Sequence, residues 1–360
     1  MIRGRLARPL MTGLLAATMA TTGVVAAPAA MAAPNLEQVR QQVQDLESKA
    51  ETATERYNQA RNELADVQQT LATLKAKVRR ERKELRSILG SVDDLARATY
   101  TSGGIDTSLQ VLLAEDPNEF LAQAAALDQI QQGQASALRR TQTTRLRLAQ
   151  SEAAVADKER IASRARKNMS DSKKEADSKL AEAQSLLNNL EQKQRDRLAA
   201  MARAERQAAI SAAAAASAAI SASSGSGGSG SAGGGYTGGG RAARAVQYAL
   251  SQVGDRYVAA AAGPSSFDCS GLTMQAWRQA GISLPHYSRS QYSTTRRVPL
   301  SQAQPGDLVF YFGSGAHHVG MYIGNGKMVH AANPRTGVVV TSVLGPWYSS
   351  RFSGIGRVVG

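Results

Sequence analysis

The sequence predicts two structural classes in one chain: an N-terminal all-α coiled-coil hairpin and a compact C-terminal α+β domain. Apolar residues recur with heptad spacing in the first half, residues 221–240 are rich in Gly and Ser, and short β-like segments follow. A chain of 360 residues with only 5% aromatic residues is too long and too poor in aromatics for one compact core. We therefore expect a leader at 1–32, a helical region at 33–220, a linker at 221–240 and a folded domain at 241–360.

The first 32 residues have the layout of a secretory signal peptide. Three arginines precede an apolar, small-residue run from Leu10 to Val25, and Ala30-Met31-Ala32 offers an A-x-A cleavage site. A retained membrane anchor is the alternative, but threonines interrupt the apolar run. We expect a mature protein that is secreted and associated with the cell wall.

The charge of the chain is positive and unevenly distributed. The net charge is +14, and residues 241–360 contain eleven Lys or Arg against three Asp. Such a basic domain suits an anionic partner. Because the leader predicts export, we expect the anionic cell envelope as this partner and no nucleic acid.

A heptad pattern defines the first helical stretch. From Leu36 to Val78 the apolar and small residues fall in alternating steps of three and four, the 3.5-residue period of a coiled-coil seam. Gly90 and Tyr100–Gly104 interrupt it, and a second helical stretch runs from about 134 to 220. Short helices are expected between them, at Ser108–Ala114 and Asn118–Ile130. The pattern predicts an antiparallel hairpin with an irregular tip, which is either a passive spacer or a regulatory or docking arm.

Residues 221–240 form a flexible tether according to their composition. Nearly all of them are Gly or Ser. Twenty such residues have an end-to-end distance of about 25 Å. This segment separates the helical region from the C-terminal domain.

Cys269 is the single cysteine of the chain, so no internal disulfide can form. The apolar pattern after it, at Leu272, Ala276 and Ala280, is helical, and Gly281 is placed to end the helix. Cys269 therefore opens a helix, whose free N–H groups and dipole favour a thiolate and could hold an oxyanion. We expect a nucleophile with a depressed pKa.

The second half of the domain supplies a base for this thiol. A three-residue hairpin loop at Gly324–Gly326 would pair Ile323 with Lys327 and set Gly320 opposite His330. His318 then lies diagonal to His330 on the same face, within reach of it. This spacing fits a base and the group that orients it. The β-like segments that carry this geometry are Asp307–Phe312, Val319–Ile323, Lys327–Ala331 and Gly337–Val343.

Two further histidines are given lesser roles. His317 is adjacent to His318 and should point to the opposite face of its strand. We expect it to be non-catalytic. His286 follows Pro285 in a loop and is expected to line the cleft.

At these residues the sequence resembles the NlpC/p60 cysteine peptidases, relatives of the papain-like fold that cut bacterial cell-wall peptides. The resemblance implies a helix packed on a small antiparallel sheet and a Cys-His-His triad of Cys269, His318 and His330. It also implies that Tyr257 borders the oxyanion site and that Asp268, Ser270, Ser288 and Gln291 belong to the oxyanion site or substrate cleft. The matching stretches are Phe267–Leu272, Pro305–Phe310, His318–Gly324 and Met328–Ala331.

One segment departs from the family pattern. Relatives follow the tyrosine with a Trp-Gly-Gly-like turn, and this chain has Val258 followed by four alanines up to Ala262. The change removes a cleft wall, and alanine adopts positive φ less readily than glycine. Because the spacing from Tyr257 to Cys269 is kept, we expect an intact triad.

The resemblance implies a secreted endopeptidase that cleaves peptidoglycan stem peptides at the D-glutamyl–diaminopimelate bond, with neither cofactor nor metal. The architecture is also similar to actinobacterial cell-separation hydrolases, in which the coiled coil restrains the enzyme or docks on a division-associated ABC-transporter-like membrane complex. Two alternatives remain open. One is an amidase or transpeptidase with the same triad, and the other is a non-catalytic wall-binding or hydrolase-activating module.

Overall fold

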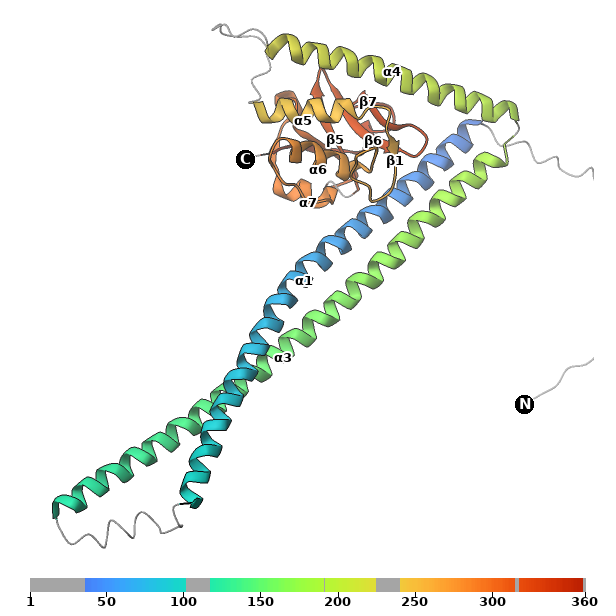
Figure 1. Cartoon of the computed structure of the whole chain (residues 1–360). Coiled ribbons are helices and arrows are strands. Elements are labelled where there is room, and N and C mark those ends of the chain that lie inside the picture. Colours follow the sequence, from blue (N-terminus) through green and yellow to red (C-terminus); the bar gives the residue numbers. More distant parts are fainter. Residues whose placement is uncertain (1–35, 102–116, 191, 225–239, 315–316, 359–360) are drawn as a thin grey trace, which may run out of the picture.

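The computed structural model describes residues 36–101, 117–190, 192–224, 240–314 and 317–358. The chain consists of a long helical hairpin and a C-terminal α+β domain that lies against the base of that hairpin (Figure 1). The predicted leader at 1–32, the predicted helix at 108–114 and most of the predicted linker lie outside the described residues. Among the described helices, none combines the length and the apolar character needed to cross a membrane.

Two helices, α1 (Leu36–Thr101) and α3 (Pro117–Asn188), form the hairpin. The seam predicted from the heptads is largely buried, as Val39, Val43 and Leu71 illustrate. The coiled-coil hairpin is therefore confirmed. The interruption predicted at Gly90 is wrong, because α1 continues through it. One glycine costs a helix only about 1 kcal/mol, which a 66-residue helix tolerates.

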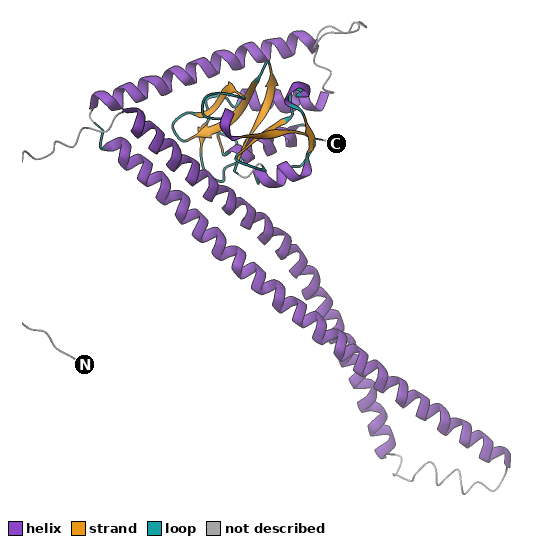
Figure 2. Ribbon diagram, turned by 180° about the vertical axis from the view of Figure 1, so that it is seen from behind, coloured by secondary structure: helices purple, strands orange, loops and turns teal. Residues whose placement is uncertain are grey.

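The second helical stretch differs from the expectation at both ends. The stretch predicted as Asn118–Ile130 and the one predicted from residue 134 are continuous in α3. The chain then turns at residues 189–190, and α4 (Gln192–Ser224) runs back along the C-terminal domain (Figures 1 and 2). Its small or apolar residues Ala209, Ala213 and Ile220 are buried in that domain's main apolar cluster. Helix α4 ends four residues into the segment predicted as linker.

The C-terminal domain is a six-stranded antiparallel sheet with helices packed on it, as predicted. Helices α5 (Gly240–Ser251) and α6 (Cys269–Gln279) contact strands β5 and β6. The strand order is β3-β8-β4-β5-β6-β7. The strands are β3 (Arg296–Val298), β4 (Leu308–Tyr311), β5 (His318–Gly324), β6 (Lys327–Asn333), β7 (Gly337–Ser342) and β8 (Phe352–Arg357).

Smaller elements complete the domain. Strands β1 (Arg256–Tyr257) and β2 (Ser266–Phe267) pair in parallel just before α6, so they help to place its first residue. The remaining elements are the short helix α7 (Ser288–Thr294) and two 3-10 turns, Leu300–Gln302 and Ser349–Arg351. The sequence pattern gave no sign of β3, β8 or α7.

The pairing of β5 with β6 is close to the predicted register. Met321 pairs with Val329, which belongs to the predicted register. Next to the loop, Gly324 and not Ile323 pairs with Lys327, because the register shifts there. The irregularity is confined to the loop end, so the faces on which the two histidines lie are unchanged.

Candidate active site

Cys269 is the first residue of α6 and is fully buried. Asp268 caps this helix, and its Oδ1 accepts a hydrogen bond from the Gly271 N–H at 2.6 Å. A side chain at Gly271 would place its Cβ 2.2 Å from the carbonyl oxygen of Ala261, so only glycine fits there. The predicted helix start is confirmed, and the cap fixes the direction of the Cys269 side chain.

His318 on β5 and His330 on β6 make the predicted contact. His318 Nε2 lies 2.8 Å from His330 Nδ1, and His330 Nε2 lies 3.0 Å from Thr341 Oγ1. A nitrogen of His318 and the Cys269 Sγ lie within 4.8 Å of each other. Burial, and then the neighbouring His318, hold the pKa of His330 well below its usual value. His330 is therefore neutral and can orient His318 by a hydrogen bond.

Tyr348 supports this pair and was not found from the sequence. Its ring stacks on His318 with centroids 5.3 Å apart and meets the edge of His330 at 5.2 Å. Burial, followed by the nearby Glu51, raises the pKa of the Tyr348 hydroxyl. Tyr348 follows β7 in a turn segment, where no periodic pattern marks a packing residue.

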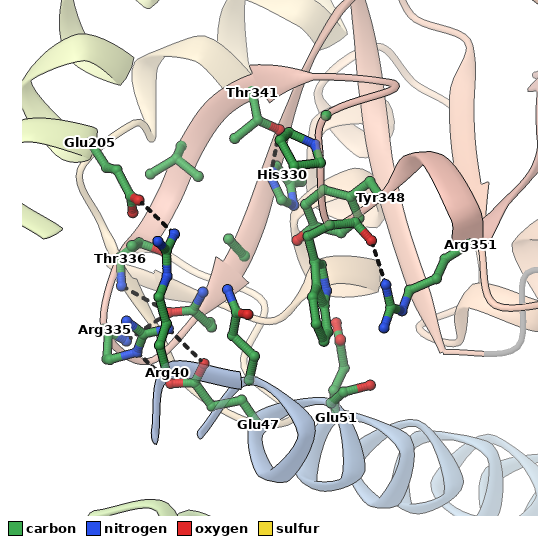
Figure 3. A pocket seen from close by; sticks show the side chains of 18 of the residues that line it. Arg40, Glu47, Glu51, Glu205, His330, Arg335, Thr336, Thr341, Tyr348 and Arg351 are labelled. Carbon is green, nitrogen blue, oxygen red and sulfur yellow. Dashed lines mark hydrogen bonds and ion pairs between the residues drawn. The ribbon is translucent and has the colours of Figure 1, made fainter. Parts of the chain in front are cut away.

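Helix α1 occupies the remaining side of the site. Glu51 Oε1 lies 2.5 Å from His318 Nδ1. Glu55 accepts hydrogen bonds from the Ser270 hydroxyl at 2.6 Å and from the Ser288 N–H at 2.5 Å. Figure 3 shows Glu51 reaching from α1 toward the site. Two glutamates of the hairpin thus contact the residues predicted to form the base and the substrate cleft.

Further contacts extend along the same face of α1. Asn58 Nδ2 donates to Asp268 Oδ2 at 2.9 Å, and Arg335 Nε donates to Glu47 Oε1 at 2.9 Å. Arg61 contacts His286 and donates to the carbonyl of Ala260. The residues of this face are Glu47, Glu51, Glu55, Asn58 and Arg61, and we call them the α1 polar stripe.

The α1 polar stripe could have been found in the sequence. Its members follow one another at steps of four, four, three and three, which places them on one side of a helix. This side differs from the apolar seam at Ala50, Ala53 and Ala60, which belongs to the hairpin of α1 with α3. A second helical stripe beside a coiled-coil seam predicts a second packing partner.

The electrostatics of the thiol contradict the expected depressed pKa. Burial, followed by the charges of Glu51, Glu55 and Asp268, raises the pKa of Cys269 well above its usual value. The thiol lies 3.8 Å from Glu55 Oε1 and 3.7 Å from the carbonyl oxygen of His317, to which it can donate. Burial and the carboxylates that α1 brings to the site outweigh the effect of the helix dipole on the thiol. In this arrangement Cys269 is a neutral thiol.

The two carboxylates beside the thiol behave differently. Burial, and then the charge of Asp268, raise the pKa of Glu55 to about 7. Burial also disfavours the Asp268 carboxylate. The nearby His286, at 2.8 Å, together with the hydrogen bonds from Asn58 and Gly271, nevertheless holds the pKa of Asp268 below its ordinary value.

The other predicted site residues have varied surroundings. Tyr257 is buried, and its hydroxyl has no hydrogen-bond partner among the described residues. Gln291 ties α6 to the loop before α7, accepting from Thr273 at 2.7 Å and donating to the carbonyl oxygens of Ser270 and Pro285. His317 stacks on Phe312 and reaches Ser48 of α1. The contacts of Gln291 and His317 therefore hold neighbouring segments together. The hydroxyl of Tyr257 remains available to a reacting group.

The turn at residues 258–262, which differs from the family pattern, keeps a backbone conformation that glycine would favour. Ala260 has a φ of 61°, although an alanine in the left-handed region costs about 1–2 kcal/mol. The carbonyl of this residue accepts a hydrogen bond from Arg61 at 3.4 Å, and the next carbonyl, of Ala261, accepts from the Asp268 N–H at 2.8 Å. The geometry next to Cys269 is thus kept at the expense of local strain.

A cavity remains open beside the covered thiol. It has a volume of about 930 Å³ and lies between α1, α4 and the C-terminal domain. Glu51, His330 and Tyr348 line its inner end, and the ion pair of Glu47 with Arg335 crosses it (Figure 3). The cavity therefore borders Glu51 and His330, while α1 covers Cys269.

The burial of Cys269 predicts slow alkylation. The side chain is 0% exposed, so iodoacetamide should react only when α1 moves away. The chain carrying Glu51→Arg and Glu55→Arg should react at least tenfold faster, because each arginine would oppose hydrogen-bond donors of the site. The measurement is the rate of carbamidomethylation of Cys269 by mass spectrometry. Equal rates in both chains would contradict a closed site.

Comparisons with known proteins agree with this geometry. A family model described as NlpC/P60 family matches residues 254–357. Probable endopeptidase p60 of Listeria monocytogenes is 45% identical over 111 residues, covering 31% of this chain and 22% of the relative. A probable endopeptidase of Mycobacterium tuberculosis is 45% identical over 115 residues, covering 31% of this chain and 30% of the relative.

Among solved structures, the peptidoglycan hydrolase RipB of Mycobacterium tuberculosis is 30% identical, covering 33% of this chain and 65% of that chain, with a TM-score of 0.30. The chain spans less than a third of the length of the curated relatives. The match to the family model and the 45% identity to two endopeptidases concern a segment with the size of the C-terminal domain. Residues 254–357 of this chain therefore form an NlpC/P60 domain.

Proposed function

We propose that the chain is a secreted, cysteine-type peptidoglycan endopeptidase that α1 holds in an inactive, closed arrangement. The observation that carries this proposal is the meeting of Cys269 with the His318–His330 pair at a site that Glu51 and Glu55 fill. The first three residues suit nucleophilic catalysis, and the two glutamates block it. The closed arrangement is defined here by the contacts of Glu51 with His318 and of Glu55 with Ser270 and Ser288.

The chemistry of the open site follows from the hydrogen bonds. Once α1 leaves, His318 Nδ1 can take the proton of Cys269, while His330 accepts from the other ring nitrogen. The thiolate attacks the substrate carbonyl, and the helix N-terminus at Cys269 holds the oxyanion together with the hydroxyl of Tyr257, which has no partner within the described part of the chain. The His318 imidazolium then protonates the leaving amine. Water hydrolyses the thioester and regenerates the thiol.

The proposed substrate is the stem peptide of peptidoglycan, cleaved at the D-glutamyl–diaminopimelate bond. Support comes from the relatives named endopeptidases and from the mycobacterial protein named a peptidoglycan hydrolase. The basic composition of residues 241–360 suits the carboxylates of such peptides. The signal-like leader supports secretion to the cell wall and a role in wall remodelling or daughter-cell separation.

The hairpin is proposed to connect this activity to a partner. Its far end lies away from the C-terminal domain (Figure 1), so a division-associated ABC-transporter-like membrane complex could bind there without meeting the catalytic site. Such a partner would activate the enzyme only by binding the open arrangement more tightly than the closed one.

Digestion of purified sacculi tests the proposed reaction. The mature chain with Glu51→Arg and Glu55→Arg, termed the released chain, should liberate peptides with a new diaminopimelate N-terminus. Mass spectrometry of the soluble fragments identifies the cleaved bond. Intact stem peptides would indicate an amidase instead, and newly cross-linked peptides a transpeptidase. The absence of any new product, with the fold shown intact by circular dichroism, would favour the non-catalytic alternative.

A further inference from the structure

We propose that the closed arrangement is a zinc site, in which Cys269, His318 and Glu51 bind one Zn²⁺ ion across the contact between α1 and the C-terminal domain. One ligand atom of each residue lies within 4.8 Å of the others, and all three side chains are buried. Thiolate, imidazole and carboxylate are the ligand types that zinc prefers. This inference rests on the closed arrangement of the proposed function and not on its peptidase activity.

The charges of the three ligands suit a divalent ion. A thiolate and a carboxylate together neutralise Zn²⁺, so the buried site would carry no net charge with a neutral imidazole. Binding would displace the proton of the Cys269 thiol and the proton between Glu51 and His318, and both would pass to solvent. The distance of 2.5 Å between Glu51 Oε1 and His318 Nδ1 must open to admit the ion.

The surroundings of His318 fix the nitrogen that would bind the metal. Its Nε2 is hydrogen-bonded to His330 Nδ1 at 2.8 Å, and His330 Nε2 is in turn bonded to Thr341 Oγ1 at 3.0 Å. Once the proton between Glu51 and His318 has left, each ring donates outward through this chain, and the lone pair of His318 Nδ1 is free to bind the ion. Support of a metal-binding imidazole through its second nitrogen is the usual arrangement in protein zinc sites.

The cavity supplies an entry path and a place for a fourth ligand. Glu51 and His330 line its inner end, and its volume of about 930 Å³ holds water. A zinc ion held by three protein ligands and one water is a common coordination. An ion in the cavity can therefore contact Glu51 first, without prior movement of α1.

The position of Glu51 makes the site specific to the closed arrangement. Two ligands belong to the C-terminal domain, but the third comes from α1, 267 residues before His318 in the chain. Withdrawal of α1 would leave only two protein ligands. An ion that binds the closed arrangement more tightly than the open one shifts the equilibrium toward the closed arrangement, by up to the ratio of the two binding affinities. Zn²⁺ would therefore hold the enzyme inactive.

Metal titration of the mature full-length chain tests the inference without substrate. We expect one Zn²⁺ per chain at micromolar or lower free metal, measured by competition with a chromophoric chelator. Co²⁺ in its place should give a thiolate-to-cobalt charge-transfer band. Glu51→Gln should weaken the affinity at least tenfold, so that the cobalt band appears only at correspondingly higher metal concentration.

Glu47→Gln is the matched control. It lies one helical turn before Glu51 in the α1 polar stripe and loses the ion pair with Arg335, but it removes no ligand. Its zinc affinity should fall far less than that of Glu51→Gln. Equal losses in the two variants, unchanged affinity in Glu51→Gln, or the lack of a bound ion in the wild type would each overturn the zinc site. None of these outcomes bears on peptide release, so the proposed function is judged separately by the digestion of sacculi.

Discussion

Replacing Cys269 with alanine in the released chain is expected to lower peptide release from sacculi by at least about four orders of magnitude. The proposed reaction passes through a thioester, and loss of the nucleophile removes this path entirely, as in other acyl-transfer enzymes. The rate of new N-terminal amines, followed with a fluorogenic amine reagent, measures the effect.

Alanine substitutions of the two histidines should lower the activity by different amounts in the same assay. His318→Ala should cost nearly as much as Cys269→Ala, because the base and the nucleophile act as a unit. His330→Ala should cost less, since His330 orients His318 by the 2.8 Å hydrogen bond and transfers no proton to substrate. Ser293→Ala, an exposed hydroxyl on α7, serves as the control and should leave the rate unchanged. Wild-type activity in Cys269→Ala would sink the proposed mechanism.

The catalytic half of the site could be predicted from the sequence because its determinants are local. Cys269 follows a helix cap and precedes a helical apolar pattern, and His318 and His330 flank one hairpin loop whose length sets their faces. Each of these inferences needs only neighbouring residues. The shift at Gly324 shows the limit of this reasoning, since a bulge altered the pairing next to the loop without moving the histidines.

The contacts of Glu51 and Glu55 with the site could not be predicted in the same way, because they join segments that are far apart in the sequence. Glu55 meets Ser270 across 215 residues, and no local rule relates the two. The heptad seam of α1 was correctly assigned to a helical hairpin, but the heptads carry no sign of what the α1 polar stripe contacts. The error in the pKa of Cys269 has the same origin, since the carboxylates that raise it belong to α1.

The course of α4 could not be predicted either. Its residues continue the helical composition of α3, so the sequence favoured one long helix. The turn at 189–190 redirects α4 onto the C-terminal domain, where Ile220 joins the main apolar cluster. The C-terminal domain is therefore held by α1 on one side and by α4 on another (Figure 1). Cleavage within 225–239 alone would leave both contacts in place.

The mature wild-type chain is expected to be about 10- to 100-fold less active than the released chain on a soluble stem-peptide substrate. In the closed arrangement Glu51 accepts from His318, and Glu55 accepts from Ser270 and Ser288. An arginine at position 51 or 55 would place its hydrogen-bond donors next to the donors of His318, Ser270 or Ser288 in a buried site. Losing one hydrogen bond between a buried group and a charge costs about 1.5–3 kcal/mol, enough to shift a largely closed population to a largely open one.

A control with the same change of charge distinguishes the effect of opening the site on the activity from the effect of added positive charge. Glu63→Arg and Asp66→Arg alter two exposed residues of α1 by the same four charge units, away from the α1 polar stripe. This chain should keep the low activity of the wild type. A soluble substrate is needed because the added positive charge alone could increase binding to the anionic wall. If wild type, control and released chain hydrolyse the soluble peptide equally fast, α1 does not restrain the enzyme, and the hairpin is a spacer or a docking arm.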